Sequence, residues 1–326
     1  MANKSFNFKK DNVLEFINTS FNKKQEVFQK YKDRKLGFEQ LDKYLEGVRP
    51  EFFVIASEPS NGKTTLLTQF TDNLAEAGET VLFFSLEQSQ FELVAKGISR
   101  ETIKNMKDKE VPESSLDIMQ NINASELRKR AIAKYKEISK NIYIIDGTSG
   151  MTVNDITNYV EEFITHTGVK PIVMVDYLQK LKGTDEKLSE RKQVDYNVTA
   201  LKGLSVGKEI PVFVISSLNR ASYNTTIGLE GLKESGDIEY GADVVIALQL
   251  KNLENVNEEK SKDKKKTLDY IKNSGTRIVD LVVLKNRNRQ MKFNDTFMYY
   301  PAYNYFLESL ESKTSEKKFG SFNKKN

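Results

Sequence analysis

The sequence predicts an α/β fold in which a mostly parallel sheet is covered by helices. From Phe52 onward, short runs that are apolar throughout alternate along the chain with longer helical segments. Strands of this kind are buried on both faces, which is typical of parallel sheets with helices on either side. The length of 326 residues is compatible with one large domain of this class and additional end segments.

The first expected element is an N-terminal helix over residues 11–31. Val13, Ile17 and Phe21 recur there at a spacing of four, which is a helical period. Little nearby can cover this apolar stripe, so we expect it to dock on another subunit. Residues 1–35 carry nine Lys and Arg against four Asp and Glu. A basic segment fits either a solvated tail or a nucleic-acid contact, and charge alone does not decide between them.

The remaining elements are expected in alternation. The expected strands are residues 52–56, 81–84, 142–145, 172–175, 212–215, 244–250 and 278–284. The expected helices are residues 64–77, ended by Gly78, residues 152–166, capped by Thr152, and residues 190–207, with a mostly helical stretch over 89–140. Residues 251–276 form a charged, turn-rich insertion, and the polar composition after residue 308 predicts a disordered tail.

Composition excludes several classes of protein. The sequence contains no cysteine, so disulfides and thiolate metal sites are excluded. Its one histidine, His166, cannot build a metal cluster and is expected on a helix surface. No apolar run reaches the ~18 residues of a membrane helix, and the first residues lack the apolar stretch of a signal peptide. We therefore expect a cytoplasmic protein with no membrane partner.

The stretch SEPSNGKTT, residues 57–65, nearly matches the phosphate-binding loop G-x-x-x-x-G-K-[ST]. It follows an expected strand and begins an expected helix, where backbone N–H groups can hold phosphates. Ser57 replaces the first glycine, which is tolerable if that position does not need a positive φ, whereas Gly62 is expected to need one. Lys63 would reach the β- and γ-phosphates, and Thr64 would bind Mg²⁺. The expected nucleotide-binding residues of this loop are Pro59, Ser60, Asn61, Gly62, Lys63, Thr64 and Thr65.

Three further segments follow expected strands, and ligands of parallel sheets bind at the carboxyl ends of strands. Asp176 ends an apolar strand and could hold Mg²⁺ or its water. Glu87 could orient and polarise a water molecule against the γ-phosphate. Lys285 and Arg287, in VVLKNRNRQ, could stabilise transition-state charge on a neighbour's nucleotide. Taken singly, each could equally be a capping, loop or solvated residue.

The order of SEPSNGKTT, VLFFSLEQS, IVMVDYLQKL, VISSLNR, LKESGDIEYGAD and VVLKNRNRQ resembles the RecA-type motor domain of DnaB-family replicative helicases. The resemblance covers roughly residues 10–307. It implies a RecA-like P-loop ATPase domain over residues 36–307, preceded by a basic segment, residues 1–35, that contains a short linker helix. The polar tail then comprises residues 308–326. That family also has a residue other than glycine at the first position of its phosphate loop.

The resemblance implies an ATP-dependent DNA helicase that uses ATP and Mg²⁺. Such a motor forms a homo-hexameric ring, hydrolyses ATP between subunits, translocates on single-stranded DNA and unwinds duplex during replication. Its linker helix docks on the neighbouring motor domain, and a loader or a primase is a possible partner. By the same resemblance, Lys63 and Thr64 bind phosphate and Mg²⁺, Glu87 is the catalytic base, and Asp176 is the Walker-B aspartate. Lys285 and Arg287 match the pair that reaches the adjacent subunit. Lys233, Glu234 and Gly236 match the loop that holds DNA.

The sequence departs from the family pattern in three ways. Only a short basic segment precedes the linker-like helix, so we expect no N-terminal collar domain, as in a phage, plasmid or mobile-element protein. Ser217 replaces a glutamine thought to sense the γ-phosphate, so we expect DNA to stimulate ATP hydrolysis weakly. Arg289 and Gln290 replace a frequent Gly-Pro pair.

Two other functions remain open from the sequence. One is a RecA-fold ATPase that binds DNA and mediates recombination or remodelling without unwinding. The other is a regulatory ring of the circadian-clock ATPase type, which binds protein, and the LKESG segment argues against it. Displacement of a strand from a forked substrate separates the helicase from the first alternative.

Overall fold

We describe the protein from a computed structural model. It describes residues 7, 11–183, 189–219, 222–223, 226–232, 235–251, 274–289 and 293–309. Lys233, Glu234 and Gln290 lie outside the described residues. So do most of the expected 251–276 insertion and the tail beyond Ser309.

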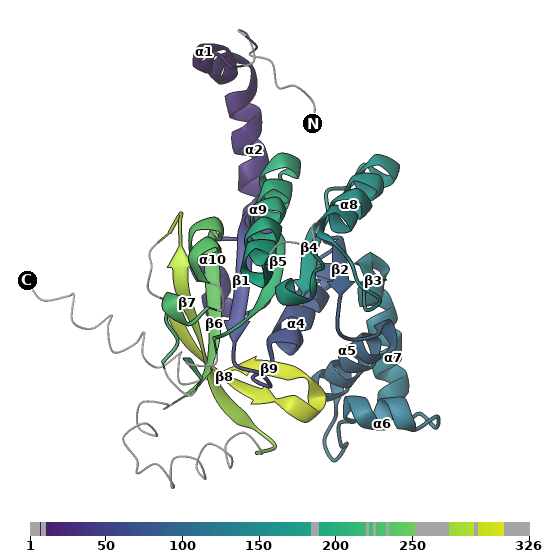
Figure 1. The fold of residues 1–326 in the computed structure, drawn as a ribbon. Coiled ribbons are helices and arrows are strands. Elements are labelled where there is room, and N and C mark those ends of the chain that lie inside the picture. The colour runs from purple at the N-terminus through teal and green to yellow at the C-terminus, as the bar shows by residue number, and fades with distance from the viewer. Residues whose placement is uncertain are drawn as a thin grey trace, which may run out of the picture.

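A nine-stranded sheet forms the centre of the domain, with the strand order β3-β2-β4-β5-β1-β6-β7-β8-β9 (Figure 1). The parallel strands are β1 (Phe52–Ser57), β2 (Val81–Ser85), β3 (Ile142–Asp146), β4 (Ile172–Asp176), β5 (Val212–Ser217) and β6 (Val244–Leu250). The antiparallel strands are β7 (Arg277–Asn286), β8 (Phe293–Tyr300) and β9 (Tyr305–Glu308). The predicted fold class is confirmed. The strands β8 and β9 were not predicted from the sequence, because β8 alternates buried and partly exposed residues and β9 has only four residues.

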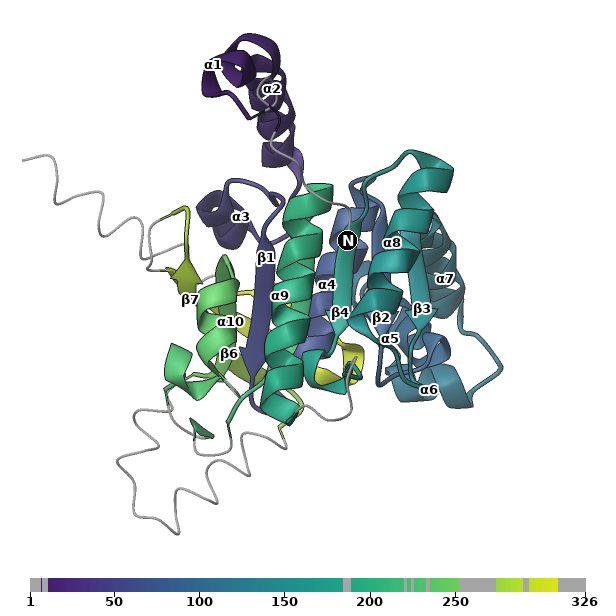
Figure 2. The same cartoon turned by 45° about the horizontal axis from the view of Figure 1, so that its top comes forward.

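Helices cover both faces of the sheet (Figure 2). One face packs against α3 (Glu39–Leu45), α4 (Lys63–Glu76) and α5 (Gln90–Asn105), and α6 (Ser115–Gln120) and α7 (Glu126–Ile138) pack against α5. The other face packs against α8 (Val153–Thr167), α9 (Glu190–Lys208) and α10 (Ser235–Gly241). Short 3-10 turns are Tyr31–Asp33, Ser139–Asn141, Leu178–Lys180, Leu229–Gly231 and Pro301–Tyr303. None of the helices in the part of the chain that the structure describes has the length and apolar character needed to span a membrane.

The central strands are apolar throughout because each face has its own core. In β1, Phe53 and Ile55 join the core under α4, whereas Phe52, Val54 and Ala56 join the core under α9. Successive side chains of a strand point to opposite faces, so a strand covered on both sides needs apolar residues at every position. A run that is apolar at every position therefore marks a strand that is buried on both faces.

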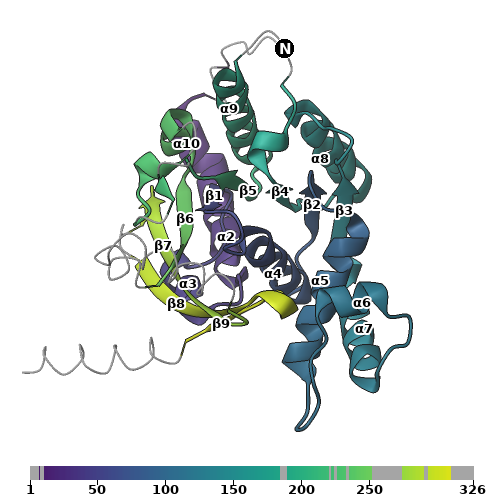
Figure 3. The ribbon, with the colours of Figure 1, turned by 60° about the horizontal axis from the view of Figure 1, so that its bottom comes forward.

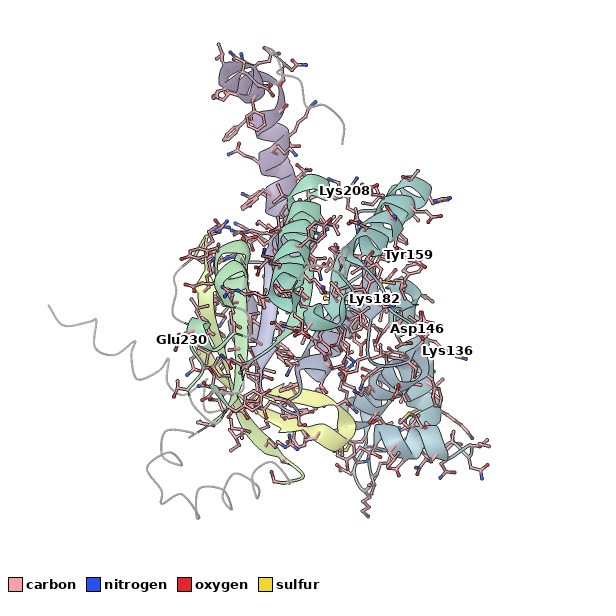
Figure 4. The ribbon with its side chains drawn as sticks, viewed as in Figure 1. Lys136, Asp146, Tyr159, Lys182, Lys208 and Glu230 are labelled. Carbon is pink, nitrogen blue, oxygen red and sulfur yellow. The ribbon has the colours of Figure 1, made fainter. Side chains whose placement is uncertain are left out.

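Capping interactions begin α8 as predicted. The Thr152 side chain accepts a hydrogen bond from the Asp155 backbone N–H, and the Asp155 carboxylate accepts one from the Thr152 N–H. This reciprocal pair satisfies two N–H groups that a helix start leaves unpaired. Lys208 lies at the carboxyl end of α9 (Figure 4). It forms an ion pair of 2.7 Å with Glu161 of α8. The two helices are thus joined over the same face of the sheet.

The N-terminal helix projects away from the body of the domain (Figure 1). It comprises α1 (Val13–Phe16), a π-helical turn (Ile17–Phe21) that the sequence did not predict, and α2 (Asn22–Lys30). The expected apolar stripe is exposed, at 72% for Val13, 51% for Ile17 and 43% for Phe21. The later part is held by its own domain, because the Arg49 guanidinium lies 4.5 Å from the Phe28 ring centroid. Docking of the stripe on another subunit stays a prediction.

A buried ion pair joins α4, α5 and the turn before β9. Arg100 Nε and Nη2 donate to Asp72 Oδ2 at 3.0 and 2.9 Å, and Arg100 Nη1 donates to the Asn304 carbonyl at 2.6 Å. Both charged residues are buried; burial raises the pKa of Asp72, and Arg100 opposes that rise. The Gln69 amide also exchanges two hydrogen bonds with the backbone of Phe306. The β7–β9 segment therefore curls toward α4 (Figure 3).

We expect Arg100→Met to lower the free energy of unfolding by about 3–5 kcal/mol, because Asp72 would be left buried without its partner. Urea-induced unfolding measures the change. Lys129→Met, which removes an exposed ion pair with Glu126, should cost less than about 1 kcal/mol. The combined variant Arg100→Met and Asp72→Leu should recover part of the loss. Equal effects of Arg100→Met and Lys129→Met would contradict the role of the buried pair.

Candidate nucleotide-binding site

The loop between β1 and α4 has the backbone that a phosphate-binding loop requires. Gly62 has a φ of 92° and caps the amino end of α4, as predicted. Ser57 is the last residue of β1 and does not have a positive φ, which explains why serine is accepted there. Ser60 has a φ of 65°, which the sequence did not predict. The amino end of α4 therefore points its free N–H groups into the loop.

Lys63 is folded over this loop. Its Nζ donates to the backbone carbonyls of Ser57 and Glu58 at 2.8 and 2.9 Å. Burial lowers the pKa of Lys63 to about 8, while Asp176, Glu87 and Glu58 oppose the shift. A partly desolvated cation at a helix start is an anion-binding arrangement, because a bound anion offsets the cost of burying the charge.

Asp176 ends β4 beside the amino end of α4. Its Oδ2 accepts a hydrogen bond of 2.7 Å from Thr64 Oγ1, and the residue is 1% exposed. Burial raises the pKa of Asp176 to about 6; Glu87 adds to the rise, whereas Thr64, Lys96 and Lys63 oppose it. A hydroxyl and a carboxylate from two different elements thus meet at one point, and Mg²⁺ prefers such hard oxygen donors.

These groups line one cleft of about 460 Å³ at the carboxyl ends of β1, β4 and β5. Asn61 is buried and does not line it. The lining residues are Pro59, Ser60, Gly62, Lys63, Thr64, Thr65, Glu87, Lys96, Asp176, Tyr177, Ile215, Ser217 and Tyr299. All expected nucleotide-binding residues except Asn61, together with Glu87, are therefore brought together by the fold.

Several residues that line the cleft were not predicted from the sequence. Lys96 comes from α5, and its Nζ donates to Gln88 Oε1 at 2.8 Å. Tyr299 comes from β8 and stacks on Phe306, with ring centroids 4.4 Å apart. Tyr299 could not be found because β8 was not recognised as a strand. Lys96 could not be predicted because the sequence does not show which face of this long, charged helical stretch packs against the sheet.

Lys285 and Arg287 do not lie at this cleft. The expectation that they share the carboxyl ends of the parallel strands with the other site residues is wrong. Lys285 lies within β7, which runs antiparallel to β6, and it pairs with Val245 near the start of β6. Ser57, at the cleft, pairs with Leu248 of the same strand β6. Val245 and Leu248 are three residues apart, so Lys285 and Ser57 lie roughly 10 Å apart along the strand direction. The carboxyl end of an antiparallel strand meets the amino ends of its parallel neighbours. The two cations therefore occupy the opposite edge of the sheet, which is the edge at which the parallel strands begin.

At that edge, both cations are held by the end of α10. Lys285 Nζ donates to the Glu239 carbonyl, and Arg287 Nη2 donates to the Tyr240 carbonyl at 2.7 Å. Carbonyls in the last turn of a helix lack intrahelical partners and attract cations. Arg289 is paired with buried Glu51 at 3.2 Å. Gly236 lies in α10, so the expected DNA-binding segment leads directly into this helix, although Lys233 and Glu234 are outside the described residues.

The fold and the cleft define a P-loop nucleotide-binding domain of the RecA-like class. Residues 35–308 match the family described as the DnaB-like helicase C-terminal domain, and the chain belongs to that family.

Known proteins of this kind share sequence and fold with the chain. It is 28% identical over 281 residues to the replicative DNA helicase DnaB of Haemophilus influenzae, covering 80% of this chain and 53% of that protein. A solved ATPase domain matches with a TM-score of 0.74 and 23% identity over 92% of this chain and 99% of that chain. A DnaB-like replicative helicase, solved for its interactions with primase, matches with a TM-score of 0.70 and 24% identity over 91% and 66%. The chain spans about half the length of the curated relatives it matches.

We expect Gly62→Ala to be more destabilising than Gly78→Ala, although both glycines have a φ of 92°. A Cβ at Gly78 meets nothing within 4 Å, so that variant should cost about 1–2 kcal/mol for the backbone alone. A Cβ at Gly62 would lie 2.8 Å from Phe306 and 2.9 Å from Tyr299, which should add about 1–3 kcal/mol. Denaturant unfolding of both variants measures the difference. Equal losses would show that the two rings do not constrain the loop.

Proposed function

We propose that this chain is the ATP-hydrolysing motor of a DnaB-type DNA helicase, which translocates on single-stranded DNA and unwinds duplex during replication. The observation that carries the proposal is the convergence of Lys63, Thr64, Asp176 and Glu87 on one cleft in a chain of this family. A bacterial, phage-encoded or plasmid-encoded cytoplasmic protein fits this function.

The cleft fits ATP with Mg²⁺. Thr64 Oγ1 and Asp176 Oδ2 are adjacent oxygen donors, and Asp176 would act directly or through water. Lys63 would leave the carbonyls of Ser57 and Glu58 to donate to the β- and γ-phosphates. Bound Mg²⁺ would supply neutralisation of phosphate charge. The loop amides at the start of α4 would hold the phosphates in register with Lys63.

Glu87 is the proposed general base. It follows the end of β2, which pairs with β4 so that Ser85 lies opposite Asp176. A carboxylate at this side of the cleft can accept the proton of a water molecule that attacks the γ-phosphate, and it keeps that water oriented. Because Glu87 is exposed in the isolated chain, water can reach it.

The position of Lys285 and Arg287 favours action on a neighbouring chain. They lie on the sheet edge opposite their own cleft, and half of the Arg287 side chain is exposed. A head-to-tail contact brings one edge of a subunit onto the opposite edge of the next, and such contacts form a ring when the rotation between subunits closes. The exposed stripe of Val13, Ile17 and Phe21 offers a second contact. We propose a homo-hexamer in which these cations stabilise transition-state charge in the adjacent cleft.

The proposed DNA contacts are Lys233, Glu234 and Gly236. A motor that translocates must hold DNA without reading its sequence, so cations and loop amides should bind phosphates. A helicase loader or a primase is a further proposed partner. A DnaB-like replicative helicase has been solved for its interactions with primase.

Strand displacement tests the function. A forked DNA substrate with one labelled strand is incubated with the protein, ATP and Mg²⁺, and release of the strand is followed. Unwinding that requires ATP supports the helicase. ATP hydrolysis and single-strand binding without displacement would favour a RecA-fold ATPase that remodels DNA or mediates recombination.

We expect Lys63→Ala to abolish ATP hydrolysis because a cation at the β- and γ-phosphates is lost. Glu87→Gln should bind ATP normally and lose turnover by about 10²–10⁴-fold, since only the proton acceptor changes. Binding of a fluorescent ATP analogue and release of phosphate separate the two effects. If Glu87→Gln hydrolysed ATP at nearly the parent rate, another group would be the base.

Arg287→Ala should lower turnover by about 10³-fold or more, as expected of a charge-stabilising residue supplied in trans. Mixing Arg287→Ala with Lys63→Ala should then restore part of the activity, because some interfaces combine an intact cleft with an intact Arg287. Native mass spectrometry confirms that mixed rings form. Mixed rings no more active than either variant alone would exclude the action in trans.

A further inference from the structure

The side chain of Gln179 joins the ends of β4 and β5. It lies in the 3-10 turn Leu178–Lys180, three residues after Asp176. Its Nε2 donates to Ser216 Oγ at 3.0 Å, and its Oε1 accepts a hydrogen bond from the Ser217 backbone N–H at 3.2 Å. One amide thus makes a donor contact and an acceptor contact with consecutive residues, which fixes both its position and its orientation.

This contact lies where the two strands separate. The register of β4 and β5 runs from Val173 and Val212 to Val175 and Val214, so Ser216 and Ser217 lie beyond the paired part. The cleft opens at these strand ends, and Ser217 lines it while Ser216 is fully buried. Gln179 does not belong to the cleft lining. Its amide spans the gap between the strand that carries Asp176 and the strand that ends at Ser217.

The end of β5 leads toward the proposed DNA-binding segment. Leu218, which follows Ser217, forms an isolated antiparallel bridge with Leu232. The Asn219 N–H also donates to the Gly231 carbonyl at 2.8 Å. Leu232 directly precedes Lys233 in the sequence. One peptide unit and one backbone bridge therefore connect Ser217 to the residue before that segment.

We propose that Gln179 is a positioning residue that couples the nucleotide cleft to single-stranded DNA binding, a role that rests on the proposed function. Asp176 would hold Mg²⁺ of the bound nucleotide at the end of β4, and the Gln179 amide would transmit the position of that end to Ser216 and Ser217. Two hydrogen bonds between neutral groups can bias such an equilibrium by roughly tenfold. Coupling between two binding sites is reciprocal, so the nucleotide should alter the affinity for DNA.

The test uses the full chain and the variant Gln179→Met, which keeps the length of the side chain and loses both hydrogen bonds. The dissociation constant of a fluorescent oligo-dT is measured without nucleotide and with a saturating non-hydrolysable ATP analogue and Mg²⁺. We expect the analogue to change the affinity of the parent by about fivefold or more, a typical coupling. In Gln179→Met the change should fall to less than about twofold, while ATP hydrolysis without DNA stays within about twofold of the parent.

Three further variants distinguish coupling from simple bracing. Gln179→Glu can accept hydrogen bonds from both Ser216 and Ser217, so it should keep at least half of the nucleotide effect on a logarithmic scale. Ser216→Ala loses one contact and should show an intermediate effect, and it carries the test if Gln179→Met does not fold. Ser205→Ala is the matched control. It removes another fully buried hydroxyl, which donates to the Ile210 carbonyl at 2.8 Å near the end of α9, and should leave the effect unchanged.

Several results would overturn the inference. One is a parent whose DNA affinity does not respond to nucleotide, and another is a response that Gln179→Met retains in full. A third is loss of DNA-free ATP hydrolysis in Gln179→Met together with a lower melting temperature, which would make the residue a brace of the cleft. A parent that neither hydrolyses ATP nor binds oligo-dT would instead refute the proposed function.

Discussion

The turn between β1 and α4 is the constraint on which the rest of the structure depends. Gly62 must adopt a positive φ, and its Cα faces the stacked rings of Tyr299 and Phe306, so there is no room for a side chain. The strand before the turn is fixed by parallel neighbours on both sides, and the helix after it is buried against the sheet. These constraints direct the amino end of α4 toward the edge of the sheet at which the parallel strands end.

That edge concentrates charges that the protein keeps partly out of water. Burial lowers the pKa of Lys63 to about 8 and raises that of Asp176 to about 6, so both groups are shifted toward their neutral forms. The mutual attraction of the two groups opposes both shifts but does not cancel them. A ligand that brings phosphate to Lys63 and a divalent cation to Asp176 would offset both costs at once. The electrostatics of the cleft thus support the proposed binding of a nucleotide together with its metal.

The direction of one strand divides the proposed chemistry between two edges. Because β7 is antiparallel, Lys285 and Arg287 emerge at the amino edge, where the last carbonyls of α10 hold them. A single subunit then has the cleft on one edge and two cations on the other. This polarity suits a head-to-tail assembly, in which each interface would complete one site. The same helix follows the proposed DNA-binding segment, so the residues proposed to contact DNA and those proposed to contact a neighbour lie close together in the chain.

Local patterns in the sequence determined the phosphate loop, Glu87 and Asp176, because each depends on a strand, a loop and a helix that are consecutive in the chain. The order of apolar runs likewise determined a mostly parallel sheet. Tertiary structure alone decided the rest. Strand direction is set by pairing between distant segments, so the sequence could not assign Lys285 and Arg287 to the opposite edge. Packing between distant segments also places Tyr299 and Lys96 at the cleft and brings Gln179 to the end of β5. No local period in the sequence encodes which faces pack together.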